Sequence, residues 1–323
     1  MQDRPCVVLL MSPATYRGGA FAEAGERIGL DLVRALDLPD ALASQWHVAL
    51  ALDFGDVDGS VRRLLDFATR DCRAPLRAIL AIDDRGSLIA AEASARLGLP
   101  HNDPASALAA RDKFVMRERL AAGGVPVPHY LRFETTIDPA SIVDGIAYPC
   151  VVKPLLLSGS RGVIRADDPA GFVEAFARTR RIVEATGSPG DVHCILVERF
   201  VPGVEVALEG LLTHGSLQTL ALFDKPDPLD GPFFEETIYV TPSCLPQDIQ
   251  AAISRRAAEA AAAIGLREGP VHAELRIDLE RGDIWMIELA GRSIGGLCSS
   301  VLEFGAGMGL EELILRHAAG IPL

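Results

Sequence analysis

The sequence predicts an α/β domain followed by an α+β region. Over roughly the first hundred residues, short apolar runs alternate with helical patterns, which is typical of an open, doubly wound parallel sheet. Further along, strand patterns follow one another and two long helical patterns interrupt them. With 323 residues, 49% of them hydrophobic and 23% charged, the chain has the size and composition of a globular protein of two or three compact units.

The N-terminal pattern predicts three β-α repeats. Each apolar run of strand length is followed by a segment with helical periodicity, and polar or glycine-containing loops separate them. In chain order we expect a strand at 6–11, a helix at 22–36, a strand at 47–53, a helix at 60–70, a strand at 78–82 and a helix that ends at Leu97. This region, residues 1–105, is predicted to be a Rossmann-like domain.

The rest of the chain is predicted to form two further units, 106–195 and 196–323. Residues 106–122 are polar and helical, and Gly123-Gly124 marks the end of that helix. The elements expected after it are strands at 150–155 and 162–166, a helix at 169–185, strands at 194–200, 205–213 and 217–223, a helix at 247–264, and strands at 272–279 and 284–289.

Charge and cysteine content exclude several classes of protein. The net charge of -13, from 44 acidic and 31 basic residues, argues against a nucleic-acid partner, which requires a basic face. The six cysteines lie far apart without a CxxC pair, which indicates reduced thiols. No apolar stretch approaches the ~20 residues of a membrane span, and the run at 6–11 is too short for a signal peptide. We therefore expect a cytoplasmic protein without a membrane partner, and a homodimer is compatible with the sequence.

A lysine inside a predicted strand leads into a loop rich in glycine and serine. Lys153 stands in the strand, and Ser158-Gly159-Ser160-Arg161-Gly162 forms the loop before the chain returns as another strand. Consecutive backbone N–H groups of such a loop can bind phosphate oxygens, and the lysine adds a positive charge. The spacing is not that of a Walker A loop. On this segment alone, an ordinary hairpin turn with a solvated lysine is an equally good explanation.

Three other segments accompany this loop in a specific order. They are Arg111-Asp112-Lys113 upstream, and residues 197–205 and 272–292 downstream. Together with the loop they resemble the ATP-grasp superfamily over residues 106–323, and more loosely over the N-terminal sheet. The resemblance implies the ATP-grasp fold, with an N-terminal doubly wound parallel sheet, a small lid domain in 106–195 and a C-terminal ATP-binding domain in 196–323.

The resemblance also implies which residues bind ATP. In this family two lysines contact the phosphates and the glycine-serine loop closes over them, while a strand end contacts adenine through its backbone and a carboxylate binds the ribose. The matching residues here are, in that order, Lys113 and Lys153; Ser158, Gly159, Ser160, Arg161 and Gly162; Glu198, Phe200 and Val201; and Glu205. Surface carboxylates on strands are the alternative for the two glutamates.

Two further glutamates are predicted to face each other across a β-hairpin. Residues 271–278 alternate, which places Glu274 on the polar face of its strand, and a second strand with Glu288 follows the turn Glu280-Arg281-Gly282. A three-residue turn with Gly282 in the left-handed conformation would place Glu274 opposite Glu288. Facing like charges need a cation between them, and carboxylates with phosphates suit Mg²⁺. A two-residue turn would instead put the glutamates on opposite faces. The resemblance agrees with the first register and implies two magnesium ions.

Arg292 and the pair Gly295-Gly296 follow this strand. The resemblance implies that Arg292 stabilises the charge of the transferred phosphoryl group, and the glycines let the chain approach a substrate closely. One position departs from the family pattern, because many ATP-grasp proteins have an asparagine ligand for the second metal ion where this chain has Ala290. Glu-x-Ala-x-Arg resembles the branch of amino-acid (dipeptide) ligases more closely.

Contacts to the substrates are expected in the acidic, aromatic segment 224–241. Glu236 lies there and is predicted to pair with a substrate ammonium. Arg17, after the first strand, is a further candidate to bind a carboxylate, because open parallel sheets bind ligands beyond the carboxyl ends of their strands. A surface loop and a solvated arginine are the alternatives.

Together these assignments predict an ATP-dependent ligase that joins a small-molecule carboxylate to an amine through an acyl phosphate, with an amino acid as at least one substrate. Lys153 and Arg292 would be catalytic, and Arg292, Gly295, Gly296 and Glu236 would contact the substrates. ATP and two Mg²⁺ would be the cofactors. The alternatives are a carboxylase-type enzyme that activates bicarbonate and a nucleotide-binding regulatory protein without ligase turnover.

Overall fold

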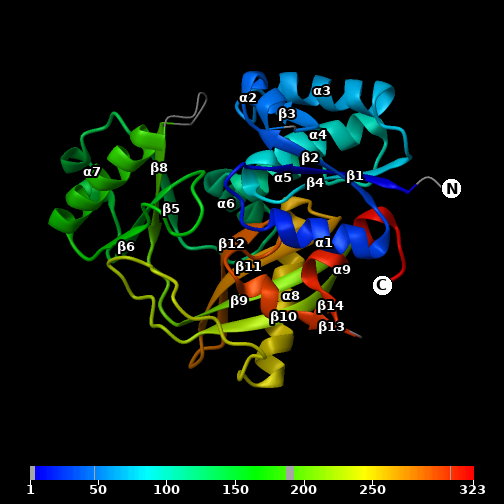
Figure 1. Cartoon of the computed structure of the whole chain (residues 1–323). Helices are drawn as coiled ribbons and strands as arrows, with labels where there is room; N and C mark the ends of the chain where they lie inside the picture. Colours follow the sequence, from blue (N-terminus) through cyan, green and yellow to red (C-terminus); the bar gives the residue numbers. More distant parts are fainter. Residues whose placement is uncertain (1–3, 47, 187–192, 306) are drawn as a thin grey trace.

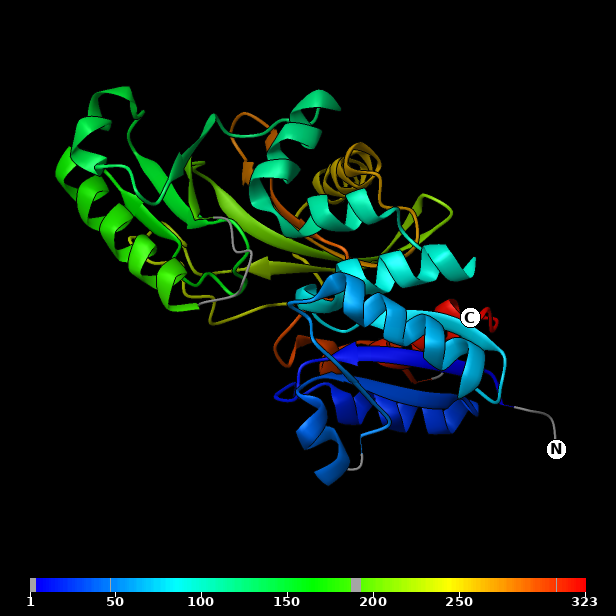
Figure 2. The same cartoon turned by 90° about the horizontal axis from the view of Figure 1, so that it is seen from above.

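The computed structural model describes residues 4–46, 48–186, 193–305 and 307–323. Within these ranges the strands form three four-stranded sheets and one short two-stranded ribbon. Figure 1 shows the first sheet and its helices at the top, the second sheet set to one side, and the third sheet below the first. Seen from above in Figure 2, the second sheet and its helix project from the rest of the molecule.

The first sheet is parallel throughout, with the strand order β3-β2-β1-β4. Its strands are β1 (Cys6–Met11), β2 (Asp31–Asp37), β3 (Leu50–Leu52) and β4 (Leu76–Ala81), and its helices are α1 (Gly18–Ile28), α2 (Asp40–Gln45), α3 (Val57–Arg70) and α4 (Ser87–Leu97). All six residues of β1 are buried, as expected for a central parallel strand covered on both faces. The α/β class predicted for this region is confirmed. Of the strand expected at 47–53, Leu50–Leu52 is β3, and His47 lies outside the described residues.

One predicted helix in this region is wrong. The helix expected at 22–36 ends at Ile28, and Asp31–Asp37 is the strand β2. Gly29, with a φ of 74°, terminates α1 in a left-handed cap. The apolar residues after it fit both a helical and a strand period over so short a run. Pairing of β2 with β1 and β3 decides the outcome, because this stretch completes the sheet.

The second sheet is antiparallel and is backed by one long helix. Two consecutive helices, α5 (Pro104–Arg111) and α6 (Lys113–Ala122), lead to it from the first sheet. Its strands are β5 (Tyr130–Glu134), β6 (Cys150–Pro154), β7 (Ile164–Ala166) and β8 (Cys194–Arg199), in the order β5-β8-β6-β7, and α7 (Pro169–Thr186) packs against it. Phe172 and Phe176 of α7 are fully buried against Val152 and Ile195 of the sheet. Strand β5 was not predicted.

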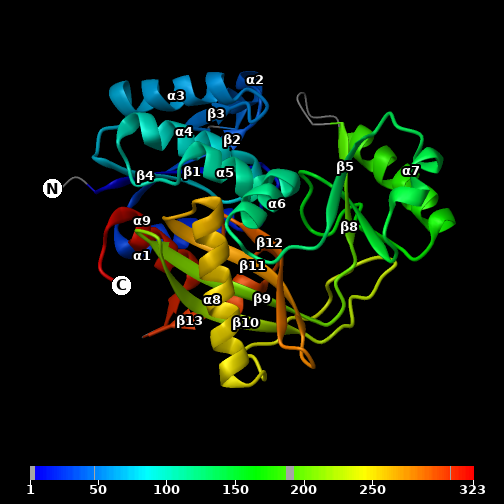
Figure 3. The ribbon, with the colours of Figure 1, turned by 180° about the vertical axis from the view of Figure 1, so that it is seen from behind.

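The third sheet carries most of the polar residues expected in the site. It consists of β9 (Val204–Thr213), β10 (Ser216–Lys225), β11 (Gly269–Asp278) and β12 (Asp283–Ala290), antiparallel in the order β10-β9-β11-β12. Helix α8 (Gln247–Ile264) packs along one face, as Figure 3 shows from behind. Helix α9 (Leu310–Ala319) packs on the other face and also against β4 and α1, so it joins the third sheet to the first. The ribbon is β13 (Glu303–Phe304) with β14 (Met308–Gly309).

The three sheets fall broadly within the three predicted units, although β8 crosses the predicted boundary at residue 195 and pairs within the second sheet. The boundaries themselves stay a prediction. No helix among the described residues is both long and apolar enough to cross a membrane.

Candidate functional site

A cavity of about 1070 Å³ lies where the three sheets meet. The candidate residues that line it come from the ends of α5 and α6, from β6, β8, β9, β11 and β12, and from the loops beside them. Of the site residues predicted from the sequence, all but Gly162 line this cavity: Lys113, Lys153, Ser158, Gly159, Ser160, Arg161, Glu198, Phe200, Val201, Glu205, Glu236, Glu274, Glu288, Arg292, Gly295 and Gly296. Residues up to about 180 positions apart in the sequence are therefore gathered in one cleft.

The two predicted phosphate-binding lysines are held by different partners. Lys113 is the first residue of α6, and Asp112 caps that helix by accepting hydrogen bonds from two backbone N–H groups. The Lys113 ammonium donates to the carbonyl of Leu157 at 2.8 Å and lies 3.3 Å from Glu288. Lys153 projects from β6, and its ammonium lies 2.6 Å from the Glu198 carboxylate. Both lysines are buried and line the cleft.

Glu198 is a buried carboxylate between two cations. Arg117 Nε donates to its Oε1 at 2.5 Å, and Lys153 contacts its Oε2. Burial by itself would raise the pKa of Glu198, but the Arg117 guanidinium and the Lys153 ammonium outweigh it and lower that pKa to about 2. The side chain is 2% exposed, so a ligand in the cleft would meet this segment mainly through its backbone. Sequence reasoning missed Arg117, although it lies four residues after Lys113, on the same face of α6.

The glycine-serine loop has the backbone that its composition predicts. Gly159, Ser160 and Gly162 have φ values of 65°, 52° and 74°, in the left-handed region that glycine favours. Gly162 anchors one end of the loop, because a Cβ there would lie 3.0 Å from Pro154 and 3.4 Å from Ile182. Thr179 of α7 also donates to the Gly162 carbonyl at 2.9 Å. Gly162 therefore fixes the base of the loop and does not face the cleft.

The predicted pairing of Glu274 with Glu288 is confirmed, but the turn that produces it is different. The strands pair at Asp278 and Asp283, so the turn spans residues 279–282 rather than three residues. That turn alone would pair Glu274 with Ile287. A β-bulge at Ile287 adds one residue to β12 and restores the pair Glu274–Glu288. The carbonyl of Ile287 accepts a 2.6 Å hydrogen bond from Arg117.

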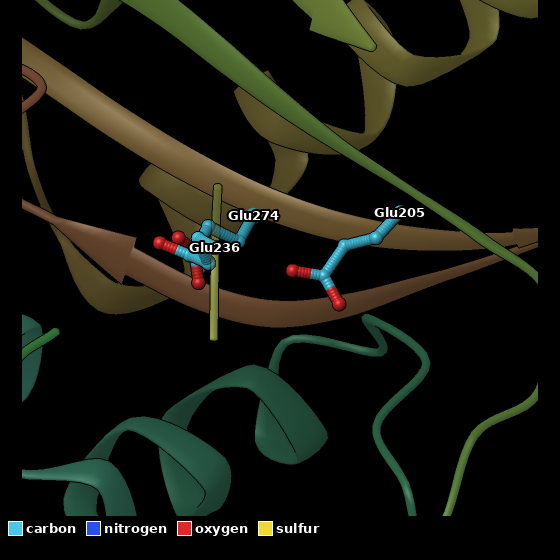
Figure 4. A group of neighbouring side chains, drawn as sticks. All are labelled: Glu205, Glu236 and Glu274. Carbon is cyan, nitrogen blue, oxygen red and sulfur yellow. The ribbon is translucent and has the colours of Figure 1, made fainter. Parts of the chain in front are cut away.

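A lysine ammonium sits among three carboxylates beside this pair. Figure 4 shows Glu205, Glu236 and Glu274, each of which offers an oxygen within 4.8 Å of the others. Lys225 Nζ lies 2.8 Å from Glu205, 2.5 Å from Glu236 and 3.1 Å from Glu274. Burial opposes the charge of Lys225, but the three carboxylates outweigh it and raise its pKa. Burial and the nearby Glu274 raise the pKa of Glu236.

The same network continues through a histidine into the third sheet. His272 lies 3.6 Å from Glu274 and 3.4 Å from Glu209, which is fully buried. Burial lowers the pKa of His272, but the two glutamates outweigh it and raise it to about 9. Glu209 also accepts a hydrogen bond from the backbone N–H of Ile294 at 2.9 Å, which fixes the loop that leads to Gly295. Nothing in the sequence pointed to Glu209.

Arg292 and Arg17, both considered as partners of a substrate carboxylate, differ in availability. Arg292 faces the cleft, where its Nε donates to Asp84 at 2.9 Å. Arg17 forms a 3.0 Å ion pair with Glu311, and both side chains are less than 10% exposed. This ion pair joins the start of α1 to α9, but Arg17 also lines the cavity, so its contact with a substrate carboxylate stays a prediction. The predicted partner of Glu236, an ammonium group, is supplied in the structure by Lys225.

Comparison with known proteins matches this arrangement to a family. The profile of the ATP-grasp domain family covers residues 146–301, which hold the glycine-serine loop, the third sheet and Arg292. The chain contains an ATP-grasp domain.

Among relatives of this chain, the alanine–anticapsin ligase of Bacillus subtilis (strain 168) is 26% identical over 240 residues, 70% of this chain and 50% of the relative. The D-alanine–D-alanine ligase of Geobacter sulfurreducens is 25% identical over 317 residues, 93% of this chain and 86% of the relative. An L-amino acid ligase from Bacillus licheniformis superposes with a TM-score of 0.77 at 25% identity, covering 99% of this chain and 75% of that one. The chain spans about half the length of the anticapsin ligases it matches.

Proposed function

We propose that this protein is an ATP-dependent, ADP-forming carboxylate–amine ligase with an amino acid as at least one substrate. One observation carries the proposal: a single cleft contains two lysines for phosphates, the facing carboxylates Glu274 and Glu288, and Arg292. The names of its relatives, which are ligases of amino acids, agree with it.

The nucleotide would lie between the second and third sheets. Lys113, Lys153 and the backbone of the loop 158–162 would hold the phosphates, and the segment from Glu198 to Val201 would meet the adenine. Glu205 would accept the ribose hydroxyls. Its carboxylate already lies within 3.2 Å of both Lys225 and Arg276, which hold it in place.

Glu274 and Glu288 fit a divalent cation. They are hard oxygen ligands on facing strands, and each has a lysine at its side, Lys225 and Lys113 respectively, that offsets part of its charge before a cation binds. We propose that they hold two magnesium ions, which when bound would neutralise charge on the phosphates. Ala290 supplies no ligand, so a second ion would depend on these two carboxylates and the phosphates.

The chemistry follows from these positions. A carboxylate oxygen of one substrate attacks the γ-phosphorus of ATP, and ADP leaves. Arg292, oriented by Asp84, stabilises the negative charge on the transferred group. The amine nitrogen of the second substrate then attacks the acyl carbon, phosphate leaves, and the nitrogen loses a proton to give the amide. The loop 158–162 would exclude water that could hydrolyse the acyl phosphate.

The substrates would be small zwitterions. Arg292 is suited to bind a carboxylate and Glu236 an ammonium, and Gly295-Gly296 leaves room beside them. A cytoplasmic location is part of the proposal, since the six cysteines are free thiols.

Phosphate release measured against single amino acids, pairs of amino acids and bicarbonate tests the proposal. Stimulation by a pair, with ADP and phosphate formed in equal amounts with an amide, is expected. Stimulation by bicarbonate alone would indicate a carboxylase, and ATP binding without turnover under any condition would indicate a regulatory protein. Formation of AMP and pyrophosphate would exclude the acyl-phosphate route.

A further inference from the structure

A second cavity, of about 570 Å³, adjoins the reaction cleft. Ala78 to Ile82, five consecutive residues at β4, line it. Side chains of a strand alternate between its two faces, so consecutive residues can all border one cavity only where that cavity lies along the edge of the strand. Strand β4 is indeed the edge of the first sheet. The cavity therefore runs along an unpaired strand edge between α4, α9 and the end of the β9–β10 hairpin.

The walls of this cavity are mainly apolar. Ala90 and Ala91 of α4 form one side, and Phe21 with Ile314 and Ala318 of α9 forms the other. Its volume falls in the range of small-molecule sites, which are apolar clefts with a few polar groups at fixed places. A mostly apolar hollow of this size beside a strand edge indicates a binding site rather than a packing defect, because protein interiors are close-packed.

Polar side chains lie at two places in this cavity. Asn102, Glu268 and His317 line this cavity alone, and a second polar group lies where it meets the reaction cleft. Ile82, Asp84, Arg111 and Ser293 line both cavities. Asp84 is already engaged by Arg292 at 2.9 Å. Arg111, at the end of α5, forms no ion pair with any carboxylate of the described residues, so the shared wall presents one uncompensated guanidinium. Burial lowers the pKa of His317, which also lines the cavity and whose Nε2 is 2.9 Å from Thr213.

We propose that this cavity is a second small-molecule site, distinct from the ATP and substrate cleft, for an apolar compound with one anionic group. The apolar part would lie along the edge of β4 between α4 and α9, and the anionic group would pair with Arg111. Such a ligand would contact Asp84, which orients Arg292, so the site is placed to sense or modulate the state of the cleft.

The fluorescent probe 8-anilinonaphthalene-1-sulfonate, an apolar aromatic anion, tests the site without requiring turnover. We expect saturable binding to the full chain that persists with excess magnesium and ATP. Ala318→Trp and Ala91→Met would fill the cavity from opposite sides and raise the Kd at least tenfold. Ala251→Trp, on an exposed position of α8 away from the cavity, is the matched control and should bind like the parent protein. Thermal melting establishes that each variant is folded.

Phenylacetate and benzyl alcohol, which share an apolar ring and differ in charge, test the role of Arg111. Phenylacetate should displace the probe and benzyl alcohol should not. Displacement of the probe by ATP, unchanged binding in both filled variants, or equal displacement by the two compounds would overturn the proposal. So would a dimer, seen by sedimentation, that the Ala318→Trp variant abolishes, because a second copy would then cover the cavity.

Discussion

Two charge clusters beside the cleft have opposite arrangements of charge. In the first, the carboxylate of Glu198 lies between Arg117 and Lys153. In the second, the ammonium of Lys225 lies among Glu205, Glu236 and Glu274. The contrast in exposure is equally clear, because the Arg117 and Glu198 side chains are 1% and 2% exposed, whereas those of Glu236 and Glu274 are 22% and 18% exposed.

This difference separates a structural cluster from a ligand-binding one. The first cluster is closed: its carboxylate is compensated by protein cations and joins α6, β6 and β8. The second cluster has an excess of negative charge and opens into the cleft, so it can accept a further cation, from a metal ion or a substrate ammonium. We expect substitutions of Arg117 and Glu198 in the first cluster to change stability and those in the second cluster to change catalysis.

The largest effect is expected from Arg117→Met. It would remove the main compensation of a buried carboxylate and leave the Ile287 carbonyl without its donor, so the free energy of unfolding should fall by about 3–5 kcal/mol. Denaturant titration measures the loss. Arg63→Met, which removes a half-exposed ion pair with Asp40, is the control and should cost no more than about 1 kcal/mol. Equal losses in the two variants would show that the first cluster is not a special source of stability.

The first cluster should also make the stability of the protein depend on pH in the acidic range. The pKa of Glu198 is about 2 in the folded protein, against an ordinary value of 4.5. A lowered folded-state pKa stabilises the protein above the unfolded pKa, and this contribution, on the order of 3 kcal/mol, is lost as the pH falls from 4.5 towards 2. Stability measured across this range should fall more steeply for the parent protein than for Glu198→Gln. Parallel profiles would contradict the assignment.

In the second cluster, Glu274→Gln should abolish most turnover while nucleotide binding changes little. The substitution removes a proposed metal ligand but leaves both phosphate lysines, so we expect kcat to fall at least about 100-fold. ATP affinity by calorimetry and turnover by phosphate release separate the two effects. Glu280→Gln, in the exposed turn of the same hairpin, should behave as the parent protein. A comparable loss of ATP affinity in Glu274→Gln would make this residue part of nucleotide binding instead.

The smallest effect is expected from Glu236→Gln, at the exposed edge of the second cluster. The KM of the amine-bearing substrate should rise about tenfold and that of ATP should stay nearly unchanged, the pattern of lost substrate binding. Glu235→Gln, whose side chain is exposed outside the cleft lining, is the matched control. If the KM of no substrate changed, Glu236 would pair with Lys225 without binding a substrate.

How far the sequence could predict these clusters depends on how local each signal is. Lys153, the glycine-serine loop and the facing glutamates belong to short motifs whose order along the chain is specific, and the structure brings them into one cleft. The clusters could not be predicted in the same way. The partners Arg117–Glu198 and Lys225–Glu274 are 81 and 49 residues apart, and only the packed sheets bring them together.

The errors in the elements have the same origin. Strand β2 was taken as helix because its apolar spacing fits both periods and only pairing with β1 decides between them. The predicted pairing of Glu274 with Glu288 is correct because two errors of one residue cancel. The turn has one residue more than predicted, and the bulge adds one residue to β12 that was not predicted. Bulges leave almost no local signal, since any residue can occupy the extra position.

The bulge at Ile287 has a consequence for protein engineering. Residues Ile284 to Met286, which lie between the turn at 279–282 and the bulge, pair regularly with β11. This paired stretch would keep its register if the turn were lengthened, so the position of Glu288 would not change. The turn itself is exposed. A peptide tag or a small domain inserted there should be tolerated, because closing a longer surface loop costs little free energy. Deleting Ile287 would remove the bulge and the carbonyl that accepts from Arg117, although Glu288 would still follow Met286 and pair with Glu274. The hairpin thus offers a permissive insertion point a few residues away from a bulge that carries a hydrogen bond to α6.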